Sequence, residues 1–273
     1  MRAITELQEI KKIELDILRS VHSFCQDKGI QYSLAYGTLL GAVRHQGFIP
    51  WDDDIDIMMP RTDYERFIRS FNHQFYQVYD CNNSSENTKQ EKGKYYLPFA
   101  KVADTRTILK EDVRYETLYG IYIDVFPVDD MPDNGRAFKR FFFWKKIINS
   151  IATLKIVKIG KRSFLKNSLL FLANILFLPI PILSLGKFAN KYAQKYNNKN
   201  MTHAAVFVPY DNRPRWVVEK EVFQQSKLLP FESYSFYCPN KAEEYLTALY
   251  GDWRQLPPEE KRVTHHSFDA WWK

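Results

Sequence analysis

The spacing of apolar residues near the start of the chain predicts an amphipathic helix. Over residues 4–25 they recur about every three or four positions, or at multiples of that interval, which gathers them on one helical face: Ile4, Leu7, Ile10, Ile17, Leu18, Val21 and Phe24. Gly29 follows as the expected stop, because glycine adopts the left-handed conformation that ends many helices. Beyond it we expect a short strand over residues 30–36, then a turn or brief helix that Gly47 ends.

Alternation of polar and apolar residues predicts two further strands. The aspartate–isoleucine alternation that contains Asp54 and Asp56 is typical of a half-buried strand, and it points both carboxylates to one face. Residues 120–126 alternate similarly, with Asp124 opposite the isoleucines, and Pro127 is expected to close the strand. Helices and strands mixed in this way predict an α+β fold.

The charge of the chain is concentrated in one segment. The sequence has 39 Lys and Arg against 32 Asp and Glu, a net charge of +7. Residues 134–210 hold fourteen of the basic residues and no acidic one, so the rest of the chain carries a net charge of −7. The segment is also apolar, and this combination favours an anionic membrane surface over nucleic acid as its partner.

This composition divides the chain into three predicted parts. Residues 1–133 form a catalytic core, residues 134–201 a basic, apolar helical insertion, and residues 202–273 a C-terminal part that completes the core. Two interpretations of the insertion stay open. It is either a helical layer that covers the core or a helix that dips into the anionic inner leaflet of a membrane.

Several features of the sequence predict a cytoplasmic protein. The basic, apolar insertion adds the alternative that the protein binds peripherally to the inner face of the plasma membrane. The first residues are charged and lack the apolar run of a signal peptide. Three widely spaced cysteines argue against a disulfide framework. The longest apolar run, residues 169–185, contains Pro179 and Pro181 and makes a poor membrane-spanning helix.

Paired carboxylates are the clearest chemical signal in the sequence. Asp54 and Asp56, held side by side, repel each other unless a cation neutralises them, and oxygen ligands favour Mg²⁺ or Mn²⁺. Asp124, on the second alternating strand, is the best third ligand. The alternatives are an acidic surface turn and a calcium loop. The calcium loop fails because its sixth position requires glycine and is Ile57.

Residues upstream of the aspartates offer contacts for a phosphate. Gly37 and Thr38 open a turn whose backbone N–H groups and hydroxyl can bind phosphate, although the pair taken alone favours a plain turn. Further candidate contacts to phosphate or acceptor are basic or imidazole side chains: Arg44, His45, Lys101, His265 and His266. A Gly-Thr turn followed by an Asp-x-Asp strand resembles the layout of the nucleotidyltransferase superfamily.

Longer motifs make the resemblance specific. Residues 37–45 (GTLLGAVRH) and 47–57 (GFIPWDDDIDI) resemble the signature of the LicD family, which is similar to fukutin-type phosphotransferases. Residues 120–129 (GIYIDVFPVD) resemble its second block, and residues 250–253, 256–258 and 262–266 resemble its C-terminal block. The resemblance implies a nucleotidyltransferase-type fold, in which helices flank a mixed sheet. It also implies a divalent metal on Asp54, Asp56 and Asp124, and a CDP-activated alcohol donor. The Gly-Thr turn departs from the Gly-Gly or Gly-Ser turn of the superfamily.

The resulting hypothesis is a metal-dependent phosphocholine transferase. It would move phosphocholine from CDP-choline to a hydroxyl of a lipid-linked glycan, a teichoic acid or polysaccharide precursor, and release CMP. Trp51, Tyr122 and Trp253 are candidates for an aromatic cage around choline. Alternatives are transfer from CDP-ribitol or CDP-glycerol, a glycosyltransferase that uses Asp54 and Asp56 to bind a nucleotide sugar, and a non-catalytic membrane-surface scaffold.

Overall fold

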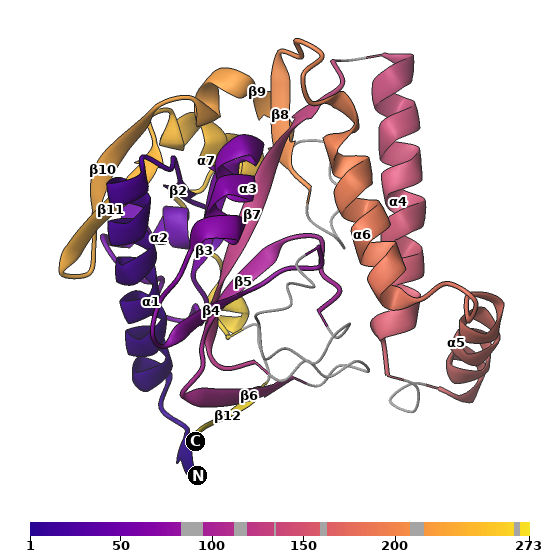
Figure 1. Cartoon of the computed structure of the whole chain (residues 1–273), viewed down its shortest axis with the longest axis horizontal. Coiled ribbons are helices and arrows are strands. Elements are labelled where there is room, and N and C mark those ends of the chain that lie inside the picture. Colours follow the sequence, from indigo (N-terminus) through magenta and orange to yellow (C-terminus); the bar gives the residue numbers. More distant parts are fainter. Residues whose placement is uncertain (83–94, 112–118, 134, 159–162, 208–215, 265–267) are drawn as a thin grey trace.

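A mixed β-sheet forms the centre of the molecule (Figure 1). The computed structural model describes residues 1–82, 95–111, 119–133, 135–158, 163–207, 216–264 and 268–273. Among them, the sheet runs in the order β2 (Ser33–Leu34), β3 (Asp56–Pro60), β7 (Tyr122–Met131), β5 (Ala100–Asp104) and β4 (Tyr76–Tyr79), with β8 (His203–Val206) on β7 and β9 (Val218–Glu219) on β8. Only the β3–β7 pair within it is parallel. The predicted α+β class is confirmed.

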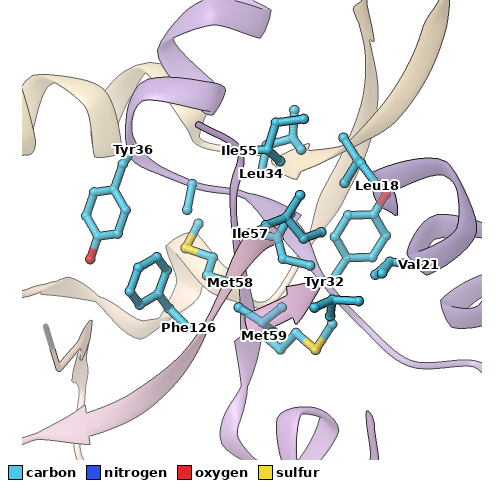
Figure 2. Close-up of a cluster of buried hydrophobic side chains, with 14 of the residues drawn as sticks. Leu18, Val21, Tyr32, Leu34, Tyr36, Ile55, Ile57, Met58, Met59 and Phe126 are labelled. Atoms are coloured by element: carbon cyan, nitrogen blue, oxygen red, sulfur yellow. The ribbon is translucent and has the colours of Figure 1, made fainter. Parts of the chain in front are cut away.

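Strand β3 is buried on both faces, whereas its alternation predicted a half-buried strand. Ile57 and Met59 lie on the side of Leu18 and Tyr32, and Met58 lies on the opposite side (Figure 2). The rings of Tyr36 and Phe126, whose centroids are 5.5 Å apart, cover that second side. Asp56, the acidic residue of this strand, is therefore largely buried.

Helices α1 (Leu7–Lys28) and α3 (Arg61–Ser70) pack on the central strands β3, β5 and β7. The predicted apolar face of α1 is buried from Ile10 to Cys25, and Gly29 ends the helix with a φ of 58°. Ile4 belongs instead to a strand, β1 (Arg2–Ile4). Helices α2 (Tyr36–His45) and α7 (Ala242–Tyr250) contact each other, which joins the early motif to the C-terminal part.

Proline 127 does not end its strand, in contrast to the sequence prediction. β7 continues through it to Met131. On the side away from β3, the pairing with β5 stops at Val125 and the pairing with β8 starts at Val128. Pro127 lies between these two partners, at a place where its missing N–H group breaks no ladder hydrogen bond on that side.

Two smaller sheets complete the β-structure. β1 pairs with β12 (Phe268–Trp272), which pairs in turn with β6 (Thr107–Glu111), so that the N and C ends lie side by side (Figure 1). β10 (Ser226–Phe231) and β11 (Tyr234–Pro239) form an antiparallel hairpin. Short 3₁₀ turns cover Gln194–Tyr196, Lys220–Phe223 and Glu259–Lys261.

The basic segment is helical, as its pattern predicted. α4 (Arg136–Ile156) and α6 (Ile182–Ala193) lie side by side, and α5 (Phe164–Leu176) stands at their outer end (Figure 1). Helices α4 and α6 share a second core cluster with the end of β7 and with β8, in which Phe141, Ile148 and Leu185 are buried. Within the described part of the chain, every helix is too short or too polar to cross a bilayer.

Candidate active site

An acidic loop leads into β3. One carboxylate oxygen from each of Asp52, Asp53 and Asp54 lies within 4.8 Å of the other two, which could hold a metal ion. Asp54 belongs to this loop rather than to the strand, which is a correction of the predicted strand geometry. A turn precedes it, in which the Asp52 N–H donates to the Ile49 carbonyl at 2.9 Å, and regular strand pairing begins only at Asp56.

Asp56 and Asp124 are register partners in the parallel β3–β7 pair. Adjacent strands lie about 4.8 Å apart and register partners share a face, so these carboxylates are neighbours. Burial, and after it the negative charges of Asp54, Asp124 and Asp52, raises the pKa of Asp56 well above its usual value. The structure thus brings these aspartates together, and their role as metal ligands stays a prediction.

Lys101 lies next to Asp124 on the other neighbouring strand, β5. Its ammonium is 2.6 Å from Asp124 Oδ1 and 3.3 Å from the centre of the Tyr122 ring. Its side chain is only 4% exposed. The Lys101 ammonium is therefore directed at Asp124. Direct contact between Lys101 and a phosphate group stays a prediction.

The start of α2 packs against the acidic loop. The Thr38 hydroxyl accepts a hydrogen bond from the Asp56 N–H at 2.8 Å and so ties α2 to β3. A Cβ atom at Gly37 would lie 2.5 Å from Asp52 Oδ2, which only glycine avoids. The positive end of the α2 dipole is therefore close to the Asp52 carboxylate, which is favourable. Tyr36, at the start of the helix, has a φ of 42°, a left-handed conformation that is rare outside glycine and that often marks functional sites.

The end of α2 contacts the C-terminal part of the chain. Arg44 donates one hydrogen bond to the Trp253 carbonyl at 2.7 Å and another to His45 Nε2 at 3.0 Å. Burial, and after it the charge of Arg44, lowers the pKa of His45. His45 is thereby kept neutral near pH 7 and acts as an acceptor toward Arg44. His265 and His266 lie outside the described residues.

A cleft of about 480 Å³ opens beside the aspartates. This size falls in the range of roughly 300–1,000 Å³ that is common for small-molecule sites. Its walls combine acidic, basic and aromatic side chains from both ends of the chain: Tyr36, Arg44, Trp51, Asp52, Asp54, Asp56, Tyr250, Asp252, Trp253 and Lys261. Of the aromatic residues proposed as a cage, Trp51 and Trp253 line this cleft. Tyr122 instead donates its hydroxyl to Glu111 at 2.8 Å and faces Lys101.

Two charged residues of α1 also lie in this region, and the sequence analysis did not identify them as site residues. The Lys11 ammonium donates to the carbonyls of Ile49 and Pro50, each at 3.3 Å, and so supports the loop. Glu14 is 3% exposed, and its Oε2 atom has no hydrogen-bond partner among the described residues. Burial, and after it the charges of the nearby aspartates, raises its pKa well above the usual value. The only sequence signal was a glutamate on the apolar face of an amphipathic helix.

Comparison with known proteins places the chain in a family. Residues 29–169 match the family described as LicD/FKTN/FKRP, nucleotidyltransferase domain. The lipopolysaccharide cholinephosphotransferase LicD of Haemophilus influenzae is 30% identical over 274 aligned residues, which cover 99% of each chain. Shorter matches are to uncharacterized proteins of Rickettsia typhi (36% identical over 76 residues, 26% of this chain and 25% of that one) and Rickettsia prowazekii (47% over 47 residues, 17% and 18%). The resemblance seen in the motifs is confirmed: the chain belongs to the LicD family and is a phosphotransferase.

Proposed function

We propose that this protein transfers phosphocholine from CDP-choline to a hydroxyl group of a cell-surface glycan and releases CMP, with a divalent cation at the acidic cluster. The relationship to a lipopolysaccharide cholinephosphotransferase extends over the whole chain and supports the phosphocholine group and a glycan acceptor. The observation that carries the proposal is the row of aspartates on one wall of a cleft that also holds cationic and aromatic side chains.

The residues present fit a Mg²⁺ or Mn²⁺ ion. Asp52, Asp53 and Asp54 offer oxygen ligands close together, and Asp56 adds a buried carboxylate whose charge is unfavourable without a cation nearby. The proposed ligands are Asp54 and Asp56, with Asp124 as the third carboxylate of the group. Bound there, the ion would neutralise the charge of the donor diphosphate.

The remaining chemistry is assigned to side chains around the cleft. Arg44 and Lys261 line it and are suited to contact phosphate oxygens. Trp51 and Trp253 are suited to face the trimethylammonium group of choline, since aromatic faces attract quaternary ammonium ions. This aromatic lining favours CDP-choline over CDP-ribitol or CDP-glycerol, whose polyol groups carry no positive charge.

The proposed reaction is an in-line displacement at phosphorus. The acceptor hydroxyl oxygen forms a bond to the phosphorus that carries choline, and the bond from that phosphorus to the bridging oxygen breaks. CMP leaves with the bonding electron pair, and the hydroxyl proton passes to a carboxylate. Asp124 is the proposed proton acceptor, and the Lys101 ammonium at 2.6 Å positions it.

Product analysis tests this proposal. The purified protein is incubated with Mg²⁺, lipopolysaccharide and one donor at a time: CDP-choline, CDP-ribitol, CDP-glycerol or a UDP-sugar. Among these donors, we expect only CDP-choline to yield CMP and choline-labelled glycan. EDTA should abolish the formation of both products. Release of UDP from the UDP-sugar would instead identify a glycosyltransferase, and transfer of ribitol or glycerol phosphate would identify another donor.

Substitutions connect the activity to the acidic cluster. Asp54→Asn and Asp56→Asn should each lower CMP release by orders of magnitude, while circular dichroism shows the fold intact. Asp269→Asn, the same change at an exposed position of β12, is the matched control and should keep normal turnover. Near-normal turnover of both site variants would contradict the proposed metal ligands.

A further inference from the structure

The helical layer exposes an unusual amount of apolar surface. Of the fifteen large hydrophobic residues that are exposed in the described part of the chain, nine lie between residues 143 and 188. They are Phe143, Trp144, Phe171, Leu172, Ile175, Leu176, Leu178, Ile180 and Phe188, here called the apolar face. Apolar groups clustered in this way usually mark an interaction surface.

Helix α5 is the centre of the apolar face. It stands at the outer end of α4 and α6, away from the central sheet (Figure 1). Leu172 and Leu176 on this helix are 60% and 72% exposed, and Leu178, just beyond it, is 71% exposed. Asn174, by contrast, is buried and donates to the Leu154 carbonyl of α4 at 3.2 Å. The helix is thus attached on one side and leaves Leu172 and Leu176 in contact with solvent.

Positive charge lies beside one part of the apolar face, around Phe143 and Phe188. Among the described residues, the exposed cations of the layer lie on α4 and around the end of α6: Arg136, Lys139, Arg140, Lys146, Lys191, Lys195 and Lys199. On α4, Lys139 and Lys146 lie within one turn of Phe143, and on α6 Lys191 follows Phe188 by three positions. The sequence between residues 134 and 210 contains no acidic residue. A surface that is apolar and cationic together matches an anionic bilayer.

The geometry excludes α5 as a spanning helix and fits one that lies in the interface. Its 13 residues give a length of about 20 Å at a rise of about 1.5 Å per residue, which is less than the ~30 Å hydrocarbon core. No described helix meets the requirements for a span. Trp144 adds a side chain that prefers the boundary between lipid and water.

We propose that the apolar face binds the surface of a bilayer that contains anionic phospholipids, with α5 inserted at the level of the headgroups. Pairing with a second copy of the chain is disfavoured, because a twofold interface places the same patch opposite itself. The exposed cations would then face one another, with no acidic residue of the segment to neutralise them. This inference rests on the surface alone and holds whatever the donor or acceptor of the reaction.

Cosedimentation with vesicles tests the proposal. The probes are vesicles of phosphatidylcholine alone and of phosphatidylcholine mixed with phosphatidylglycerol. We expect binding to the mixed vesicles, weakening as salt rises, and a blue shift of tryptophan emission that Trp144→Phe removes. The triple variant Phe171→Ser, Leu172→Ser, Leu176→Ser should lose binding roughly tenfold or more. The triple reversal Lys139→Glu, Lys146→Glu, Lys191→Glu should lose it by a similar factor.

A matched control comes from another exposed surface. Lys227→Glu with Leu228→Ser makes the same kinds of change on β10 and should leave binding unchanged. All altered side chains are exposed, so thermal melting should show each variant folded. The proposal is overturned if the wild type ignores the mixed vesicles at low salt, or if the control variant loses as much binding as the other two. It is also overturned if sedimentation shows a dimer that the serine variant dissociates and the wild type binds no vesicles.

Discussion

Replacing Glu14 by glutamine should stabilise the protein at neutral pH. Glu14 is a buried carboxyl group on α1, close to the acidic loop, with one oxygen that accepts no hydrogen bond among the described residues. Burial, and after it the charges of Asp54, Asp53 and Asp52, raises its pKa well above the ordinary value of 4.5. Glutamine has the same shape and carries no charge that could be desolvated or repelled.

The size of the effect follows from proton linkage. Above about pH 4.5 the unfolded chain releases the Glu14 proton, while the folded protein keeps it until the raised pKa is reached. Stability from Glu14 is therefore fully present at low pH and is lost as the pH rises through this window, by about 1.4 kcal/mol for each pH unit. The buried Asp56 contributes a loss of the same sign, but it is present in both proteins and largely cancels in the comparison.

Urea unfolding at several pH values in EDTA measures this difference. The two proteins should be equally stable at about pH 4, and the Glu14→Gln variant should gain with each step toward pH 7. In a thermal melt, each kcal/mol of this stability difference corresponds to a shift of roughly 2–4 °C in melting temperature for a large domain. Glu260→Gln, which removes an exposed charge, is the control and should show no such trend. A Glu14→Gln advantage that stays flat across this range, or a variant less stable at pH 7, would refute the reasoning.

Three further predictions concern the site itself. Lys101→Met removes the ammonium 2.6 Å from Asp124 and should destabilise the fold by about 3–5 kcal/mol, which a lower urea midpoint would show and an unchanged midpoint would contradict. Gly37→Ala places a Cβ atom 2.5 Å from Asp52 Oδ2, so Mg²⁺ should raise the melting temperature of the variant less than that of the wild type; equal shifts would mean that the loop adapts. Asp54→Asn should abolish the Mg²⁺-induced rise in melting temperature, and a rise of normal size in this variant would remove Asp54 from the proposed ligands.

Local patterns predicted the elements that carry the main motif. The periodicity of α1, the turn or brief helix at α2 and the paired aspartates were all visible, because each depends on residues close together in sequence. The family resemblance depended on the same short-range order and is confirmed. The division of the chain at residues 133 and 201 stays a prediction, as does the role of each proposed site residue.

The features of the site and fold that could not be predicted from the sequence depend on contacts between segments that are distant in the chain. Lys101 meets Asp124 because of the antiparallel register of β5 and β7, which no local pattern specifies. Glu14 stands among aspartates some 40 residues later in the chain, so its charge signalled a buried polar group without indicating its neighbours. The strands β1, β6 and β12 are short, and their pairing with remote partners left no periodic trace in the sequence.

The pairing of β1 with β12 has a consequence for the order of folding. Residues 2–4 find their partners only at residues 270–272, so nearly the whole chain must leave the ribosome before this small sheet can close. Until then, the backbone N–H and C=O groups of β1 have no strand partner, and such unpaired strands can pair with other nascent chains and promote aggregation. Its three-residue length and the arginine within it limit that danger, and the central sheet can assemble first, because its first five strands all come from the first half of the sequence.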